Sequence, residues 1–407
     1  MEKLVTLERA REIIQNLRDT YYYNRGVENS VVDLSIIGRD LSKDVVAPED
    51  SPPRDTASYD GYAMRSEDAA RYPLRIEGSV YAGDPYDSLK RLERGEAVYI
   101  ATGAFLPPGA DCVLRLEDAR VEGRSLYGIP ISKGTKVVPR GSNYRRGEVI
   151  LRKKSRIRPQ EYGILKGLGV EEVEVYLKPR VAVLATGNEI ASGTLRDVNS
   201  HVVMAYMHTW GCETAYLGAV RDEYERVRDA LLQGAENFDC VVTSGGVSVG
   251  RRDYVLRALE ELGDVWLYKV KTRPGKPFAV GVVNETPVFA LPGKPTGALV
   301  ATILHLRGYF LGIQEEPHIK VRITEDVLLS RTDTDSSDMA NLVFVSLENG
   351  YARPVGFEGS AMPLIKKGEK YNVSAIAANL RSALVDGYAI IERDTGRGEE
   401  IRVHFFT

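Results

Sequence analysis

The spacing of hydrophobic residues changes several times along the chain, and each change marks a different kind of structure. Residues 4–16 predict an amphipathic helix that Thr6 can cap. One face of this helix carries the apolar residues Leu7, Ala10, Ile13, Ile14 and Leu17. Residues 38–60 then lose the helical period and include Pro48, Pro52 and Pro53, which indicates a loop or a crossing between domains.

Two parts of the chain alternate polar and apolar residues in short segments, a pattern typical of β-structure. In residues 74–151 these segments recur between turns and predict a small all-β domain. In residues 318–407 they predict a compact, β-barrel-like domain at the C-terminus, with one helix near residues 374–380. The step Asp60-Gly61, which precedes the first of these regions, is a turn signal.

After Pro179 the pattern becomes an alternation of strands and helices. The strands we expect are residues 180–185, 211–220, 240–242 and 265–270, and the helices are residues 199–208, 223–233, 253–262 and 298–311. This alternation predicts a doubly wound parallel sheet with helices on both faces. The fold class is therefore multidomain α/β plus β, with a central parallel-sheet domain and flanking β-rich domains.

The stretch from Asp239 to Tyr254 is the one around which the other motifs are arranged. A short apolar strand runs into a glycine turn and then into a helix, which is a geometry that offers backbone N–H groups to an anion. Gly245 and Gly246 allow close backbone approach, and Ser248 and Asp253 add a hydroxyl and a carboxylate. The same residues also fit a tight strand–helix connection in which Asp253 only caps the helix.

A second strand end in the same domain carries Thr186-Gly187-Asn188-Glu189. Ligands of such sheets bind beyond the carboxyl ends of the strands, so we expect this loop beside residues 244–253. Cationic residues in the same domain, Lys271, Arg273, Lys276 and Lys294, point to a phosphate-bearing ligand.

Composition narrows the classes of partner and compartment. The chain has 407 residues, enough for two to four domains, and a formal net charge of −3, which gives no reason to expect nucleic acid or an anionic membrane. No run reaches the roughly 18 apolar residues of a membrane span, and the first ten residues lack a secretory pattern. The three isolated cysteines fit a reducing cytoplasm and exclude a CxxC metal site.

Taken together, the motifs resemble those of the molybdopterin molybdenumtransferases, the family of the bacterial MoeA proteins and the E domain of gephyrin. The matching segments occur in family order from about residue 30 onward. They are Ser58-Tyr59-Asp60-Gly61-Tyr62-Ala63, Thr102-Gly103-Ala104, Pro107-Pro108-Gly109-Ala110-Asp111, Thr186-Gly187-Asn188-Glu189, Asn199-Ser200, residues 244–253, Pro274-Gly275-Lys276-Pro277-Phe278 and Leu291-Pro292-Gly293.

The resemblance implies an elongated homodimer of four-domain subunits in the cytoplasm, with the active site at the subunit boundary. The implied domains are an elongated dimerisation domain (1–45 with 145–178), a small β domain (46–144), a MogA-like α/β domain (179–316) and a C-terminal β domain (317–407). The implied reaction is metal-dependent insertion of molybdate or tungstate into adenylated molybdopterin, with release of AMP. A MogA-like adenylyltransferase and acceptor apoenzymes are the further partners that it suggests.

The resemblance also implies roles for individual residues. Asp60, Glu189 and Asp253 would hold Mg²⁺ (or Zn²⁺) and, with Lys276, form the catalytic set. The substrate-binding residues would be Thr102, Thr186, Gly187, Ser244, Gly245, Gly246, Ser248, Gly250, Lys271, Arg273, Pro292, Lys294, Pro295 and Ser360.

At three places the sequence departs from the family pattern, and each departure removes an acidic residue or adds a basic one around the site. Asn143 stands where the family usually has Asp, Lys294 replaces a usual Asn, and Arg251-Arg252 occupies positions that are commonly acidic or neutral. These changes keep open a non-catalytic or scaffolding homologue that binds the pterin or a partner protein. A third alternative is an adenylyltransferase like MogA, whose fold the central domain should share. The flanking β domains and the Asp60-Gly61 motif favour the enzyme over this third alternative.

Overall fold

A computed structural model describes residues 1–247, 253–313, 317–329, 338–357, 369–371 and 385–406 of the 407-residue chain. The expected helix at 374–380 and the site candidates Ser248, Gly250 and Ser360 lie outside these ranges, as does Arg251-Arg252. The chain divides into one unit of residues 1–27 with 176–407 and another of residues 28–175.

The first unit is built around a seven-stranded sheet. Its strands lie in the order β1 (Glu2–Val5), β17 (Asp264–Val270), β19 (Ala279–Val283), β20 (Thr286–Leu291), β16 (Cys240–Ser244), β14 (Arg180–Thr186) and β15 (Glu213–Val220). The predicted parallel order holds for the last four of these strands, whereas β19 runs antiparallel to both of its neighbours. The reason is a hairpin whose two turn residues, Asn284 and Glu285, have φ values of 48° and 65°.

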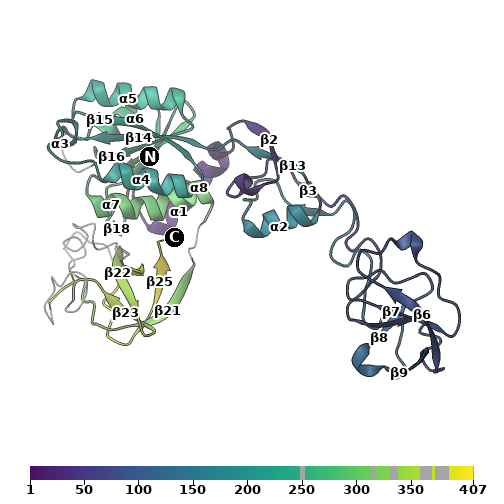
Figure 1. Ribbon diagram of the computed structural model, residues 1–407. Coiled ribbons are helices and arrows are strands. Elements are labelled where there is room, and N and C mark those ends of the chain that lie inside the picture. Colours follow the sequence, from purple (N-terminus) through teal and green to yellow (C-terminus); the bar gives the residue numbers. More distant parts are fainter. Residues whose placement is uncertain (248–252, 314–316, 330–337, 358–368, 372–384, 407) are drawn as a thin grey trace. The chain divides into compact units, whose positions relative to one another are not determined.

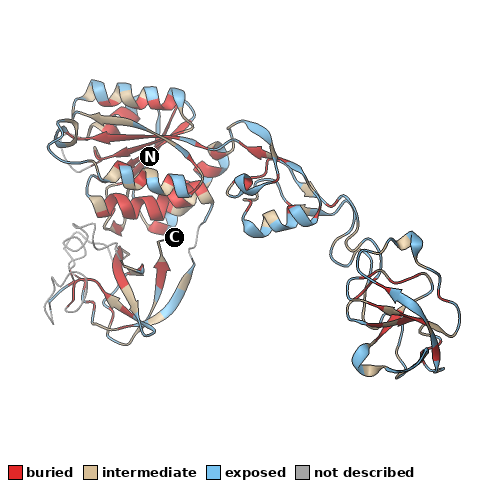
Figure 2. Ribbon diagram, in the orientation of Figure 1, coloured by how far each residue is buried: buried red, intermediate tan, exposed pale blue. Residues whose placement is uncertain are grey.

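Helices cover both faces of this sheet, as the alternation predicted. Figure 1 shows α5 (Tyr224–Asn237) and α6 (Tyr254–Leu262) on one face. The other face is covered by α1 (Leu7–Leu17), α4 (Asn199–Thr209), α7 (Pro295–Ala301) and α8 (Arg307–Leu311), with a π-helix, η5 (Thr302–Leu306), between the last two. Burial is densest along the sheet and along α7 (Figure 2).

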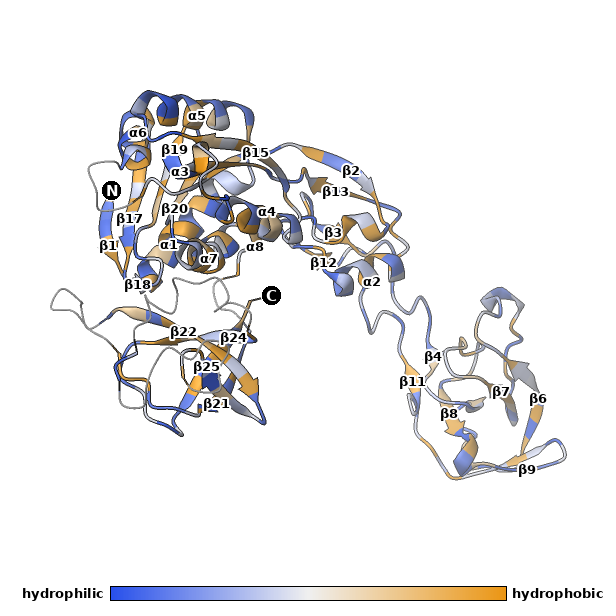
Figure 3. Cartoon of the chain, turned by 60° about the vertical axis from the view of Figure 1, so that its left-hand side comes forward, coloured by the Kyte–Doolittle hydropathy of each residue, from blue (hydrophilic) through white to orange (hydrophobic). Residues whose placement is uncertain are grey.

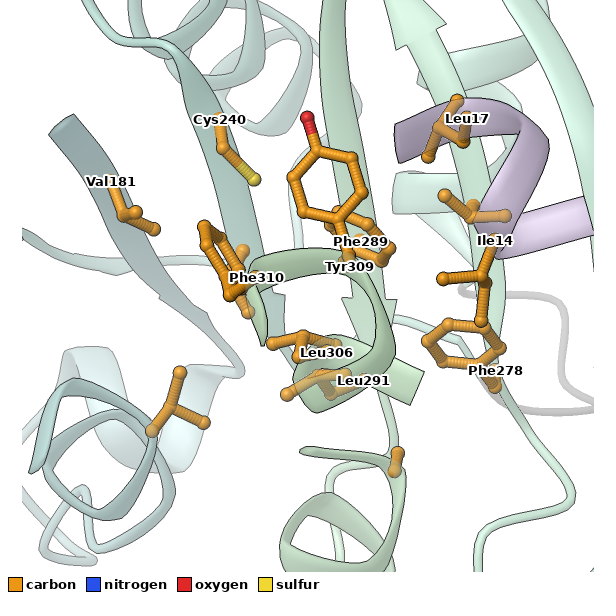
Figure 4. Close-up of a cluster of buried hydrophobic side chains, with 14 of the residues drawn as sticks. Ile14, Leu17, Val181, Cys240, Phe278, Phe289, Leu291, Leu306, Tyr309 and Phe310 are labelled. Carbon is orange, nitrogen blue, oxygen red and sulfur yellow. The ribbon is translucent and has the colours of Figure 1, made fainter. Parts of the chain in front are cut away.

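The strands of this sheet read as continuous apolar runs because both faces are buried. In β14, Val181 and Val183 pack into the cluster under α1 and α8, while Ala182 between them packs into the cluster under α5 and α6. Figure 4 shows the first cluster, in which Phe289 of β20 and Phe278, which precedes β19, meet side chains of α1 and α8.

The N-terminus departs from the sequence prediction. We expected a helix from residue 4, but Leu4 lies in β1 and the helix begins at Leu7, with Thr6 Oγ1 accepting from the Arg9 N–H at 3.2 Å. Strand β1 pairs in parallel with β17. Residues 1–27 therefore lie in the unit of the α/β sheet, although we had grouped them with residues 145–178.

The C-terminal residues form a β-barrel, as predicted. Strands β22 (Ala340–Glu348), β23 (Tyr351–Pro354), β21 (His318–Ile323), β25 (Glu400–Phe405) and β24 (Gly387–Ile391) pair in this order, and pairing of β24 with β22 closes the ring (Figure 3). The short strand β18 (Thr272–Arg273), which follows β17, pairs in parallel with β22.

The second unit contains the predicted small β domain. Its six-stranded sheet has the order β8 (Cys112–Arg115), β5 (Gly61–Met64), β7 (Glu96–Ile100), β6 (Leu74–Val80), β10 (Ser125–Tyr127) and β9 (Arg120–Glu122). The prediction of a turn at Asp60-Gly61 missed that Gly61 begins β5. A Cβ at Gly61 would lie 2.0 Å from the Leu114 carbonyl oxygen, so the close approach of β8 requires glycine here.

Shorter elements complete the second unit. Strand β4 (Thr56–Ala57) pairs with β11 (Val137–Val138), β3 (Val45–Val46) with β12 (Val149–Leu151), and β2 (Val27–Val31) with β13 (Glu172–Tyr176). Helix α2 (Pro159–Gly167) places Leu165 in a core that includes Ile36 and Ile157. None of the helices in the described ranges is long and apolar enough to cross a membrane.

Candidate functional site

A cavity of about 890 Å³ lies in the α/β unit, beyond the carboxyl ends of β14, β16 and β20. Its volume falls in the range of small-molecule sites. It is lined by residues of five segments, 185–190, 195–199, 244–247, 272–277 and 292–297, together with Asp222. The strands bring these loops together because Ala185 pairs with Ser244, and Ser244 pairs with Leu291.

The loop after β14 presents Glu189 to this cavity. Gly187 has φ 136°, and a Cβ there would lie 3.0 Å from Glu189 Oε1. Its N–H donates to the Val220 carbonyl oxygen at 3.1 Å, which ties the loop to β15. Glu189 stands in the first turn of the short helix α3 (Asn188–Ala191) and is exposed, and it forms no ion pair with any residue that the structure describes.

The glycine turn after β16 is fixed by its neighbours on both sides. The Gly245 N–H donates to the Leu291 carbonyl oxygen at 3.0 Å. Gly245 has φ 92°, and a Cβ there would lie 2.8 Å from both Thr186 O and Thr186 Oγ1. The Gly245 backbone therefore lies close to Thr186, the last residue of β14, which is the kind of close backbone approach that we predicted at this glycine.

Helix α4 holds the loop after β20. Asn199 Nδ2 donates to the Gly293 carbonyl oxygen at 2.8 Å. Lys294 follows as the exposed N-cap of α7, and Pro295 opens the helix. Lys294 therefore lies at the cavity in a loop whose preceding residue, Gly293, is held by a hydrogen bond.

The loop at 272–277 brings Arg273 and Lys276 to the cavity. Pairing of Thr272 with Ala340 and of Arg273 with Asn341 holds its start against the barrel strand β22. Lys271, predicted to be a further cation of the site, does not line the cavity. Its Nζ forms an ion pair with Asp338 Oδ2 at 2.7 Å.

The cavity thus collects most of the predicted residues of this unit. They are Thr186, Gly187, Glu189, Ser244, Gly245, Gly246, Arg273, Lys276, Pro292, Lys294 and Pro295. Lys271 and Asp253 do not line it, and Asp60 and Thr102 belong to the unit of residues 28–175.

Asp253 precedes α6 and is partly buried. Tyr268 Oη donates to Asp253 Oδ2 at 3.3 Å, while Oδ1 has no hydrogen-bond partner among the described residues. Burial raises the pKa of Asp253 to about 6, against the lowering effect of the Tyr268 hydrogen bond. Asp253 is therefore a carboxyl group whose charge is poorly compensated, which is a common property of groups in functional sites.

Asp60 and Thr102 lie together in the small β domain. The Thr102 N–H and the Thr102 hydroxyl both donate to Asp60 Oδ1, each at 2.7 Å. Both hydrogen bonds hold the pKa of Asp60 below its usual range, and the one from the Thr102 backbone N–H has the larger effect. Thr102, predicted to bind substrate, is in this structure the residue that fixes the Asp60 carboxylate.

Two carboxylates line the cavity that the sequence did not single out. Asp197 accepts from the Ser200 N–H at 3.0 Å and from Tyr216 Oη at 2.9 Å; burial and this carboxylate raise the pKa of Tyr216 to about 12. Asp222 follows β15 and also lines the cavity. Asp222 could have been found as a polar residue at a strand end, and Asp197 as an acidic residue just before a helix.

The donor set of the cavity fits Mg²⁺ better than Zn²⁺. Magnesium is usually held by one or two carboxylates together with substrate phosphates, and Glu189 and Asp222 can supply such carboxylates. Zinc sites draw on His and Cys, neither of which lines the cavity in the part of the chain that the structure describes. Nowhere in the described ranges do three or more potential metal-ligating side chains cluster.

Two parts of the chain match the models of known domain families. Residues 182–311, which form most of the cavity, match the model of a probable molybdopterin binding domain. Residues 5–169 match the model of the MoeA N-terminal region, domains I and II.

Full-length relatives then define the family. The chain is 32% identical over 272 residues to the molybdopterin molybdenumtransferase of Haemophilus influenzae, covering 64% of this chain and 67% of the relative. It is 31% identical over 320 residues to the Bacillus subtilis protein of the same name, covering 74% of each. The chain belongs to the family of molybdopterin molybdenumtransferases, which are enzymes of molybdenum cofactor biosynthesis.

Solved structures agree over the whole length. Two structures of the molybdopterin biosynthesis protein MoeA from Pyrococcus horikoshii match this chain at 31% and 25% identity, with TM-scores of 0.70 and 0.73. Each match covers 99% of this chain. A likeness of this extent favours the MoeA reading over an adenylyltransferase like MogA, whose fold would account for the central domain alone.

Proposed function

We propose that this protein inserts molybdate, or tungstate, into adenylated molybdopterin and releases AMP. The observation that carries the proposal is the cavity at the carboxyl ends of β14, β16 and β20, where Arg273, Lys276 and Lys294 meet a glycine turn. The substrate carries phosphate groups and the second reactant is an oxyanion. Cationic side chains and backbone N–H groups are the protein groups that stabilise such charges.

The residues of the cavity divide into two sets in this reaction. Arg273, Lys276 and Lys294 bind the phosphates and the incoming oxyanion, and they stabilise negative charge on the AMP leaving group. Neither Lys276 nor Lys294 has an ion-pair partner among the described residues, so both ammonium groups are available to a ligand. Glu189 would hold the divalent cation at the cavity, and Asp60 and Asp253, which do not line the cavity, are the further carboxylates of the proposed set.

The divalent cation, which we propose to be Mg²⁺, would supply neutralisation of the phosphate charge and polarisation of the phosphorus–oxygen bond that is cleaved. We also propose that the protein acts in the cytoplasm as a homodimer. Its further partners would be the adenylyltransferase that supplies the substrate and the apoenzymes that accept the finished cofactor.

The test is a turnover assay with adenylated molybdopterin, molybdate and Mg²⁺, in which released AMP is measured by chromatography. The parental protein should release AMP only when both molybdate and Mg²⁺ are present. Lys276→Gln should slow release by about tenfold or more, because a charged contact to a phosphate is lost. Lys178→Gln is the matched control, since it removes the same charge from an exposed position of the same unit, outside the cavity.

One observation favours a second candidate function. Asn143 stands where the family usually has an acid, and its Nδ2 lies 3.3 Å from Ser51 Oγ as a neutral hydrogen-bonding group. A chain with fewer acids around the cation could bind the pterin as a scaffold without turnover. The same assay separates the two: binding of adenylated molybdopterin without AMP release, at any Mg²⁺ concentration, would establish the scaffold and refute the enzyme.

A further inference from the structure

Three tyrosine rings gather at one end of the sheet in the small β domain; we name Tyr62, Tyr81 and Tyr99 the tyrosine platform. Tyr62 in β5 and Tyr99 in β7 are directly opposite in the ladder, with ring centroids 6.1 Å apart. Tyr81 follows β6, and its ring centroid lies 6.0 Å from that of Tyr99. Strands β6 and β7 are visible side by side in this domain in Figures 1 and 3.

The platform is open to solvent, unlike the rest of that face of the sheet. Further along the same face, Met64, Ala97 and Cys112 are fully buried in a hydrophobic cluster. Tyr81, in contrast, is 55% exposed, and Tyr62 and Tyr99 are each partly exposed. Tyr62 packs against this cluster, whereas Tyr81 and Tyr99 lie beyond it, so the three rings form an aromatic surface at the edge of the cluster that is partly open to solvent.

A fixed carboxylate stands beside this aromatic surface. Asp60 directly precedes β5, and both hydrogen bonds from Thr102 reach the same oxygen, Oδ1. Among the described residues, none donates a hydrogen bond to Asp60 Oδ2 and none forms an ion pair with Asp60, so this oxygen is available to a donor. Gly61, which follows Asp60, pairs with Ile100, which follows Tyr99, so the Asp60 carboxylate lies beside the platform. Burial and the charge of Asp60 both raise the pKa of Tyr99.

An aromatic surface next to an oriented acceptor suits a flat ligand that carries N–H groups on its edge. Aromatic rings bind planar heterocycles by stacking, whatever the identity of the base. A carboxylate with a free oxygen accepts hydrogen bonds from an exocyclic amine or a ring N–H. A second protein is a poorer occupant, because specific protein interfaces need about 20–30 residues on each side.

We propose that the tyrosine platform stacks a planar nitrogen heterocycle of the substrate, and that Asp60 Oδ2 accepts hydrogen bonds from the amino edge of this ring. The inference rests on the proposed function, since adenylated molybdopterin contains two such rings, a pterin and an adenine. It gives Asp60 a binding role that does not require a metal ion.

The test uses the full chain in the presence of EDTA, with neopterin as a fluorescent pterin probe and AMP as the adenine probe. Stacking should quench neopterin fluorescence, and a titration then gives the dissociation constant. Tyr99→Leu should weaken binding by about tenfold or more, and Tyr81→Leu, at an exposed position, by a smaller factor. Tyr99→Phe should retain most of the affinity because the ring is kept.

Tyr127→Leu is the matched control. Tyr127 lies in β10 of the same sheet and is also partly exposed, but it lies outside the platform and under the guanidinium of Arg120 at 4.8 Å. This variant should bind neopterin like the parental protein. If AMP competes with neopterin and shows the same dependence on Tyr99, the adenine is a ligand of the platform; if AMP does not compete, the ligand is the pterin.

Two results would overturn the inference. One is that neither neopterin nor AMP binds the parental protein, and the other is that a folded Tyr99→Leu variant binds both as tightly as the parental protein. The turnover assay distinguishes a wrong inference about the platform from a wrong proposed function. Parental AMP release with an unchanged KM in Tyr99→Leu would refute the platform alone, whereas absence of parental AMP release would refute the enzyme.

Discussion

The imidazole of His305 makes the α/β domain sensitive to acid. His305 lies in the π-helix η5 with a fully buried side chain, and its ring stacks on Phe278 at a centroid distance of 4.3 Å. Neither ring nitrogen has a hydrogen-bond partner among the described residues. Burial, and secondarily the charge of Arg11, lowers the pKa of His305 from 6.5 to about 3.

The sign and size of the effect follow from proton linkage. Above the unfolded pKa of 6.5, His305 is neutral in both states and adds no pH dependence to the free energy of unfolding. As the pH falls below that value the unfolded state takes up a proton and the folded state does not, so stability declines until the pH reaches the folded pKa of about 3. Each pH unit costs about 1.4 kcal/mol, so the change from about pH 7.5 to about pH 5 should remove ~2 kcal/mol of the free energy of unfolding.

The perturbation is His305→Phe, which keeps a ring against Phe278 and removes the titrating group. Urea unfolding followed by tryptophan fluorescence reports on this domain, because the two tryptophans of the chain, Trp210 and Trp266, both pack in its core. The free energy of unfolding should fall by ~2 kcal/mol less in the variant than in the parental protein between about pH 7.5 and about pH 5. His208→Gln, at an exposed position of α4, serves as the control and should keep the parental pH dependence.

An identical loss of stability in His305→Phe and in the parental protein would refute this reasoning. It would mean that the imidazole is protonated in the folded state at about pH 5, and hence that the ring finds water or a charged partner. Comparing the pH-dependent change of one protein with that of another cancels the contribution of the carboxylates, because those groups are the same in all three proteins.

Three further perturbations test the site. Gly245→Ala should destabilise the α/β domain by about 1–3 kcal/mol in urea, because φ is 92° and the new Cβ would lie 2.8 Å from Thr186 O; an unchanged midpoint would contradict the geometry. Asp253→Asn should abolish AMP release while the fold is kept, and a parental rate would mean that Asp253 takes no part in the reaction. Asn143→Asp should lower the Mg²⁺ concentration needed for half-maximal AMP release, because a further carboxylate should strengthen Mg²⁺ binding by an amount on the order of 1–3 kcal/mol. Superimposable Mg²⁺ titrations of the two proteins would place residue 143 outside the metal site.

Features that depend on local pattern could be predicted from the amino-acid sequence. The strand at Cys240–Ser244 and the helix at Tyr254–Leu262 were predicted within two residues, because an apolar run and a helical period each encode burial locally. The convergence of Glu189 with the glycine turn was also predicted, since parallel strands place their carboxyl ends at one edge. The resemblance to the family rested on motifs of the same local kind.

The tertiary structure decided which groups meet across long distances in the chain. Nothing near Lys271 indicates that Asp338 neutralises it, and nothing in residues 2–5 indicates a strand that pairs with β17. The need for glycine at position 61 comes from the Leu114 carbonyl oxygen of another strand. Hydrophobic periodicity specifies that a residue is buried or exposed, but the partner of a charge or of a backbone N–H is set by the packing of distant segments.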